Sequence, residues 1–239
     1  MWGLANPDRF MRLTRGWSAA FGLLAAGLIA AGLWLGFVAP EDYQQGDTVR
    51  IMFVHVPAAW VALAAYVGLG AASFSAFVWR HNLAEAAAKT CAPLGAAFTV
   101  LALITGSLWG RPMWGAWWVW DARLTSVVVL LLFYLGCIAL RAAMDDETRG
   151  GRAAAILAMV GLVNLPIVKF SVDWWSTLHQ PASVFRADGP TMTAEYLWPL
   201  LLMGLGYSLA FGALWITAIR TEVVRRRVAV RAARLAGDA

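Results

Sequence analysis

Residues 51–79 read IMFVHVPAAWVALAAYVGLGAASFSAFVW and contain no Asp, Glu, Lys or Arg. A hydrocarbon core about 30 Å thick is crossed by an α-helix of about 20 apolar residues, so this run is long enough to span a membrane and to tilt or protrude. Further apolar runs lie at about residues 18–38, 91–109, 124–140, 153–172 and 195–219. The sequence therefore predicts an all-α integral membrane protein, a bundle of six transmembrane helices.

The composition supports a membrane protein and excludes soluble and disordered classes. The chain has 239 residues, of which 61% are hydrophobic and 14% charged, and its mean hydropathy is +0.65. A soluble domain carries about 25% charged residues and needs polar surface to cover its core, whereas disordered chains are poor in apolar residues. We expect one membrane domain at residues 1–219 and a basic tail at 220–239.

Lysine and arginine set the expected orientation of the spans. Of the 19 in the chain, all but five lie near one set of span ends; the exceptions are Arg50, Arg111, Arg123, Lys169 and Arg186. Since cytoplasmic ends carry the excess of positive charge, both termini are expected in the cytoplasm and three loops outside. The pI near 9.7 then reflects this asymmetry rather than nucleic-acid binding, and the tail suits anionic lipid or a cytoplasmic partner.

Neither the lysines nor the cysteines of the chain form a motif of known chemistry. The only lysines, Lys89 and Lys169, do not follow glycine in a phosphate-binding loop, so ATP hydrolysis would have to come from another subunit. Cys91 and Cys137 fall within expected spans and not in a C-x-x-C-H motif. They indicate neither an external disulfide nor thioether attachment of haem.

The second external loop contains an unusual tryptophan cluster, WGRPMWGAWWVWDARLT at residues 109–125. Pro112 suits the first turn of a short helix, and one face of that helix would carry Trp114, Trp117, Trp118 and Asp121. Such an indole surface suits a large planar ligand, although an aromatic belt at the membrane interface is the alternative. Asp121 is expected either to pair with Arg123 or to cap the fourth span.

Two of the three histidines are expected near this cluster. His55 lies near the outer end of the second span and His179 in the third outer loop, whereas His81 lies in an inner loop. Two neutral imidazoles can ligate one haem iron, unless both are structural residues. The haem propionates would need cations, and arginine binds carboxylates with two hydrogen bonds; the outward candidates are Arg50, Arg123 and Arg186.

The run WGAWWVWDARLT at residues 114–125 resembles the tryptophan-rich WWD motif of haem-handling proteins. With six spans, His55 before Pro57 and Trp60, and WWSTLHQ at residues 174–180, the whole chain resembles the cytochrome c maturation protein C (haem exporter protein C) family. The residues that match the family's signature are Trp114, Trp117, Trp118, Trp120 and Asp121. His55 and His179 match its axial haem ligands.

This resemblance implies a bacterial inner-membrane protein with a tryptophan-rich periplasmic loop that binds haem b non-covalently. It implies delivery of haem to a membrane-anchored periplasmic haem chaperone for c-type cytochrome biogenesis. The implied partners are an ABC-type ATPase subunit, a second membrane subunit and a small single-span subunit. The chain itself would not be an enzyme, since covalent attachment would occur on the chaperone.

Two other functions remain open from the sequence. A cytochrome-b-like electron carrier would use the same two histidines, but such carriers usually hold haem between spans, and His179 is expected in a loop. A solute permease would use the tryptophan loop as a gate, but few charged residues occur at mid-span, where they would mark a substrate path. A partly exposed haem, open to a partner, fits transfer better than either alternative.

Overall fold

A computed structural model describes residues 6–237. Residues 1–5 of the expected membrane domain and 238–239 of the expected tail lie outside this range. The described chain is helical, with an isolated bridge between Asp42 and Gly46 in place of any strand. Its elements are α1 (Pro7–Leu13), α2 (Trp17–Val38), the 3-10 helix η2 (Asp47–Ile51), α3 (Met52–Trp79), α4 (Asn82–Trp114), α5 (Ala122–Ala143), α6 (Glu147–Gly161), α7 (Asn164–Trp174) and α8 (Ala194–Gly237).

Six helical segments within residues 6–237 are long and apolar enough to cross a membrane. They are Trp17–Val38, Asp47–Trp79, Asn82–Trp114, Ala122–Ala143, Glu147–Trp174 and Ala194–Gly237. Each contains one of the six runs expected from the sequence, with ends that differ by several residues. The prediction of a six-span, all-α membrane protein is confirmed.

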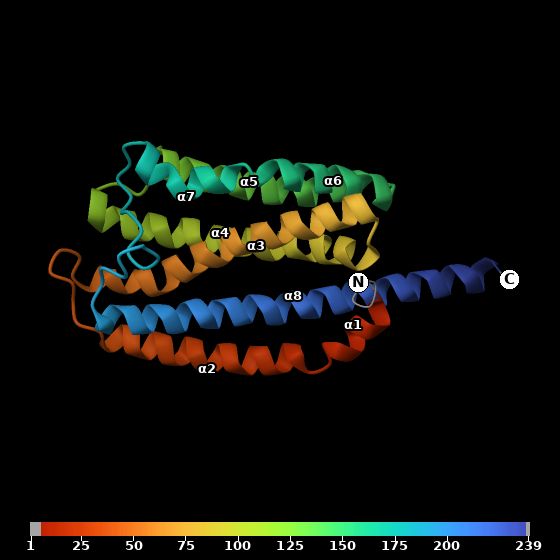
Figure 1. The fold of residues 1–239 in the computed structure, drawn as a ribbon, viewed down its shortest axis with the longest axis horizontal. Helices are drawn as coiled ribbons and strands as arrows, with labels where there is room; N and C mark the ends of the chain where they lie inside the picture. Colours follow the sequence, from red (N-terminus) through yellow and green to blue (C-terminus); the bar gives the residue numbers. More distant parts are fainter. Residues whose placement is uncertain (1–5, 238–239) are drawn as a thin grey trace.

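The helices run up and down through one elongated bundle (Figure 1). Helix α2 packs along α8, α3 along α4, and α5 against α6 and α7. The connections α2–α3, α4–α5 and α7–α8 gather at one end of the bundle, and α3–α4 and α5–α6 at the other, beside α1. His55, the tryptophan cluster and His179 therefore share the first end, although they are far apart in sequence.

The fifth span is interrupted, unlike the continuous helix that the apolar run at 153–172 predicts. Helix α6 ends at Gly161 and α7 begins at Asn164. Pro166 has no N–H to donate to the Leu162 carbonyl four residues earlier, and that oxygen instead accepts from Leu165 N at 3.1 Å. The proline thus explains the break, and it lies in the first turn of α7, where it is tolerated.

The last span continues into the basic segment. Helix α8 runs from Ala194 to Gly237, so the described part of the expected tail at 220–239 extends the same helix. Its basic segment contacts the N-terminal part of the chain, because Arg220 donates to Met11 O at 2.7 Å and Arg227 pairs with Asp8 at 2.6 Å.

Small residues allow the central helices to pack closely around two tyrosines. Tyr66 and Tyr134 are fully buried and meet edge to face at 4.9 Å between ring centroids. A Cβ added at Gly95 would fall on the Tyr134 ring, and one added at Gly161 would fall on the Tyr66 hydroxyl. Tyr134 also donates to Ala62 O at 2.8 Å. Close packing of this kind stabilises helices in lipid, where apolar side chains gain little from burial alone.

Candidate functional site

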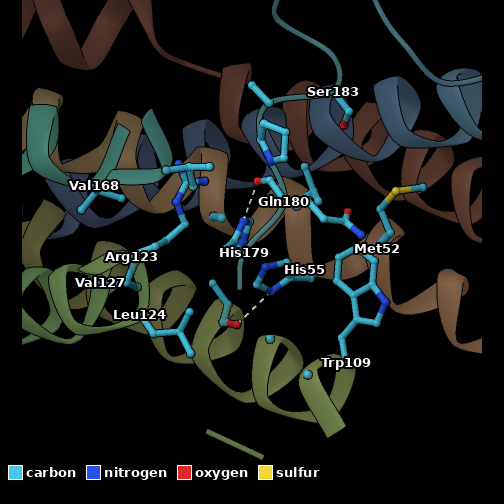
Figure 2. Close-up of a pocket in the computed structure, with 18 of the residues that line it drawn as sticks. Met52, His55, Trp109, Arg123, Leu124, Val127, Val168, His179, Gln180 and Ser183 are labelled. Atoms are coloured by element: carbon cyan, nitrogen blue, oxygen red, sulfur yellow. Dashed lines mark hydrogen bonds between the residues drawn. The ribbon is translucent and has the colours of Figure 1, made fainter. Parts of the chain in front are cut away.

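A cavity of about 290 Å³ lies at the end of the bundle where the three longer loops gather. Ligand sites usually enclose about 300–1,000 Å³ and are mostly apolar with a few polar groups. The walls are formed by helices α3, α4, α5 and α7, by Trp118 between α4 and α5, and by segment 179–185. The large side chains among them are Met52, Trp60, Trp109, Met113, Trp114, Trp118 and Phe185. Figure 2 shows His55 and His179 lying within it.

His55 projects from the second turn of α3 and is fixed by the facing helix α4. Its Nδ1 lies 3.0 Å from Ala102 O and 3.2 Å from Thr105 Oγ1. Because a carbonyl can only accept, Nδ1 carries the hydrogen, and the lone pair is on Nε2. The ring is also packed against Trp109, edge to face at 5.7 Å, and against Gly106, where an added Cβ would lie 2.8 Å from His55 Cε1.

His179 reaches the cavity from the non-helical segment between α7 and α8. Its Nδ1 lies 2.8 Å from Gln180 O, so this imidazole also carries its hydrogen on Nδ1. Burial lowers the pKa of His179 below 6.5, and the positive charge of Arg123 lowers it further. A neutral ring with an unprotonated Nε2 is the form that binds a metal.

The two imidazoles share the same arrangement. In both, Nδ1 is turned to a backbone carbonyl and both rings line one cavity (Figure 2). Such a hydrogen bond orients an imidazole ligand and raises its basicity. His81, by contrast, caps the start of α4 by accepting from Ala84 N at 3.2 Å, at the other end of the bundle.

The predicted short helix across residues 112–121 is wrong. Helix α4 continues to Trp114, so Pro112 lies in its last turn, and Gly115 ends it with φ +75°, a left-handed conformation that favours glycine. Residues 115–121 then form a non-helical connection. Asp121 caps the next helix, α5, with Oδ1 accepting from Leu124 N at 2.8 Å.

This connection divides the tryptophans into two pairs. Trp114 and Trp118 line the cavity, and Trp114 packs 6.4 Å from the His179 ring. Trp118 Nε1 is buried and has no hydrogen-bond partner within residues 6–237. Trp117 and Trp120 are 54% and 74% exposed and lie outside the lining of the cavity.

Only one of the three candidate arginines lines the cavity. Arg123 lines the cavity, and its guanidinium donates to Ser171 Oγ at 3.0 Å and Lys169 O at 3.1 Å. Because Arg123 binds these two groups and not Asp121, Asp121 has the second of its two expected roles, the cap of α5. Arg50 pairs with Asp47 at 2.5 Å and lies outside the lining residues, as does Arg186.

Sequence reasoning did not single out the face that α4 presents to His55. Ala102, Gly106, Trp109 and Met113 all line the cavity, and their spacing of four, three and four residues is that of one helical face. Trp109 is held in place because its Nε1 donates to Gln45 Oε1 at 2.9 Å. The periodicity could have revealed this wall, but the small residues within it carry no chemical signal.

The residues present fit a planar aromatic ligand with a metal at its centre. Two neutral imidazoles offer nitrogen ligands, indole and other apolar groups offer stacking surfaces, and Arg123 offers a cation at the wall. The Trp118 Nε1–H, buried and without a partner within residues 6–237, is a further unused donor. This donor set matches haem, with imidazole ligands for iron and donors for its carboxylates.

Comparisons with known proteins show which family the chain resembles. Residues 1–234 match the family described as heme exporter protein C. Heme exporter protein C of Bradyrhizobium diazoefficiens is 56% identical over 228 residues, 94% of this chain and 86% of the relative. Heme exporter protein C of Escherichia coli K12 is 45% identical over 227 residues, 94% of this chain and 89% of the relative.

Proposed function

This chain belongs to the heme exporter protein C family, and we propose that it holds haem between His55 and His179 and delivers it to a periplasmic haem chaperone. The family places the chain in haem export for cytochrome c maturation. The observation that carries the finer proposal is that two histidines, 124 residues apart in sequence, line one cavity with both Nδ1 atoms bound to carbonyls. Haem b would bind there non-covalently.

The remaining contacts follow from the walls of the cavity. Trp114 and Trp118 would offer apolar surfaces to the porphyrin, and Arg123 and the unpartnered Trp118 Nε1–H would offer donors to its carboxylates. Asp121 holds this wall together as the cap of α5. Arg50, which pairs with Asp47, has no haem contact in this proposal. The cavity, about 290 Å³, is at the lower limit for such ligands, so an edge of the haem would stay exposed to a partner.

The proposal also includes the side of the membrane on which the site lies and the subunits with which the chain works. The cavity faces the periplasm from the bacterial inner membrane, with both termini in the cytoplasm, as the distribution of lysine and arginine favours. ATP hydrolysis takes place in a separate ABC-type subunit, together with a second membrane subunit and a small single-span subunit. The chain transfers haem and does not catalyse its covalent attachment.

We expect Gly106→Ala to lower haem affinity. The new methyl group would lie 2.8 Å from His55 Cε1, so the ring must shift from its position against Ala102 O. Loss of such an orienting contact costs about 10–100-fold in metal affinity. Haem titration of the purified protein measures the change. The matched control is Gly27→Ala in α2, where an added Cβ has no neighbour within 4 Å; equal affinities for both variants would contradict the assignment of His55.

The exposed pair Trp117 and Trp120 should serve transfer rather than binding. We expect the double variant Trp117→Ala, Trp120→Ala to keep its haem content and lose at least about tenfold in the rate of transfer to the chaperone, because exposed indoles are strong anchors for protein partners. Stopped-flow mixing of haem-loaded protein with haem-free chaperone measures this rate. The control is Trp34→Ala on α2, also exposed, at 66%. Loss of haem from the double variant, or unchanged transfer, would contradict the proposal.

A further inference from the structure

A second cavity, of about 300 Å³, lies at the end of the bundle opposite the histidine site. Its walls come from the end of α3, the start of α4, the facing ends of α5 and α6, and α8. Five cationic side chains line it: Arg80, Lys89, Arg141, Arg152 and Arg226. Only two carboxylates line it, those of Glu85 and Glu147, so the cavity carries an excess of positive charge.

Both carboxylates are already paired. Glu85 is bound by Arg141 and Arg226, and Glu147 accepts from Lys89 at 3.4 Å and from Arg225 at 2.9 Å. Glu222 is buried outside the lining and pairs with Lys89, Arg225 and Arg226.

Arg80 and Arg152 make no ion pair within residues 6–237. Their two guanidinium groups are therefore open to an external anion. The anion would enter a cavity whose own acids are already neutralised.

The backbone at Arg80 is an independent observation. Arg80 ends α3 with φ +51° and ψ +41°, and it is the one non-glycine residue with positive φ in the described chain. Glycine adopts this conformation most readily at the end of a helix. An unfavourable conformation retained at a cavity points to a use for the side chain, and here that side chain is a guanidinium at the cavity.

The surface beside the cavity is apolar and exposed. Phe77 lines the cavity and is 43% exposed, and its neighbours Phe74, Val78 and Trp79 are 48%, 50% and 66% exposed. All four lie in the last turns of α3, a membrane-spanning helix. The cavity thus lies where an apolar, lipid-facing surface meets a basic one, which is the level of phospholipid headgroups.

We propose that this cavity binds the phosphate headgroup of an anionic phospholipid, with its acyl chains along the exposed end of α3. Arg80 and Arg152 contact the phosphate oxygens, since a guanidinium fits two of them at once. Basic pockets between transmembrane helices are known to hold anionic headgroups. Such a lipid would join α3, α4 and α6 at the end of the molecule remote from the histidine cavity.

The test uses the full-length chain, delipidated in a non-ionic detergent and titrated with phosphatidylglycerol or phosphatidylcholine, with native mass spectrometry counting the bound lipid. We expect one tightly held phosphatidylglycerol per chain and no comparable phosphatidylcholine. The double variant Arg80→Gly, Arg152→Gln should weaken phosphatidylglycerol binding by about fivefold for each arginine. Glycine suits the backbone at position 80, so this variant should fold, and an unchanged haem spectrum would confirm that it does.

The matched control is Arg149→Gln with Arg231→Gln, which removes the same charge from residues that are exposed and outside the cavity. It should bind phosphatidylglycerol as the parent does. Equal loss in both double variants would show diffuse attraction and overturn the site. Equal binding of the two lipids would do the same. Displacement of phosphatidylglycerol by an equal concentration of inorganic phosphate would identify free phosphate as the ligand and overturn the lipid assignment.

Discussion

Replacement of His55 or His179 by alanine is expected to have the largest effect on haem binding. Each variant would lose one of two nitrogen ligands from a site where both imidazoles are held through Nδ1. Since disturbing only the groups that orient a ligand costs about 10–100-fold in metal affinity, removal of the ligand itself should cost at least as much. The purified variants should contain little haem, or haem with an altered absorption spectrum.

His81→Ala is the matched control for these variants. His81 caps α4 through Ala84 N at the opposite end of the bundle, so its loss should cost about 1 kcal/mol of stability and leave the haem spectrum unchanged. If all three alanine variants kept the parent spectrum, or all three changed it alike, the assignment of the two ligands would be wrong.

Gly95→Leu is expected to have the largest effect on stability. The new side chain would occupy the position of the Tyr134 ring, which is fully buried and donates to Ala62 O at 2.8 Å. Overpacking costs about 1–3 kcal/mol, and the lost hydrogen bond adds about 1 kcal/mol. We therefore expect the free energy of unfolding to fall by about 3 kcal/mol, measured by SDS titration of the protein in detergent micelles.

Gly27→Leu in α2 provides the comparison, since an added Cβ there has no neighbour within 4 Å. It introduces the same side chain into another membrane-spanning helix and should change the free energy of unfolding by less than about 0.5 kcal/mol. Equal destabilisation by both variants would mean that α4 and α5 do not pack through Gly95 as the structure shows.

The six spans could be predicted from the sequence because a membrane requires long apolar helices, and such runs are visible without any tertiary information. Their interruptions were harder to predict. Pro166 breaks the fifth span by removing one hydrogen bond, whereas Pro57, Pro93 and Pro199 lie within continuous helices. Neighbouring helices can compensate a missing bond, so packing determines which proline ends a helix.

The candidate site could likewise be predicted only in part. Alternation of the spans was enough to place His55, the tryptophan cluster and His179 at one end of the bundle, and in the structure both histidines and part of the cluster line one cavity. The helical spacing of Trp114, Trp117 and Trp118 was misleading, because Gly115 ends α4 at φ +75°. Whether a glycine continues a helix or ends it depends on its neighbours in space, which a single sequence does not contain. For the same reason, the sequence could not show that the Ala102 carbonyl orients His55, because the two residues lie on different helices.

The central proposal is that His55 and His179 would both ligate the iron of one bound haem. Electron paramagnetic resonance of the ferric, haem-loaded protein tests it most directly, because it distinguishes six-coordinate low-spin from five-coordinate high-spin iron. We expect a low-spin signal for the unaltered chain and for His81→Ala, and high-spin or absent haem for His55→Ala and His179→Ala. A high-spin signal from the unaltered chain, or a low-spin signal that persists when both histidines are replaced, would contradict it.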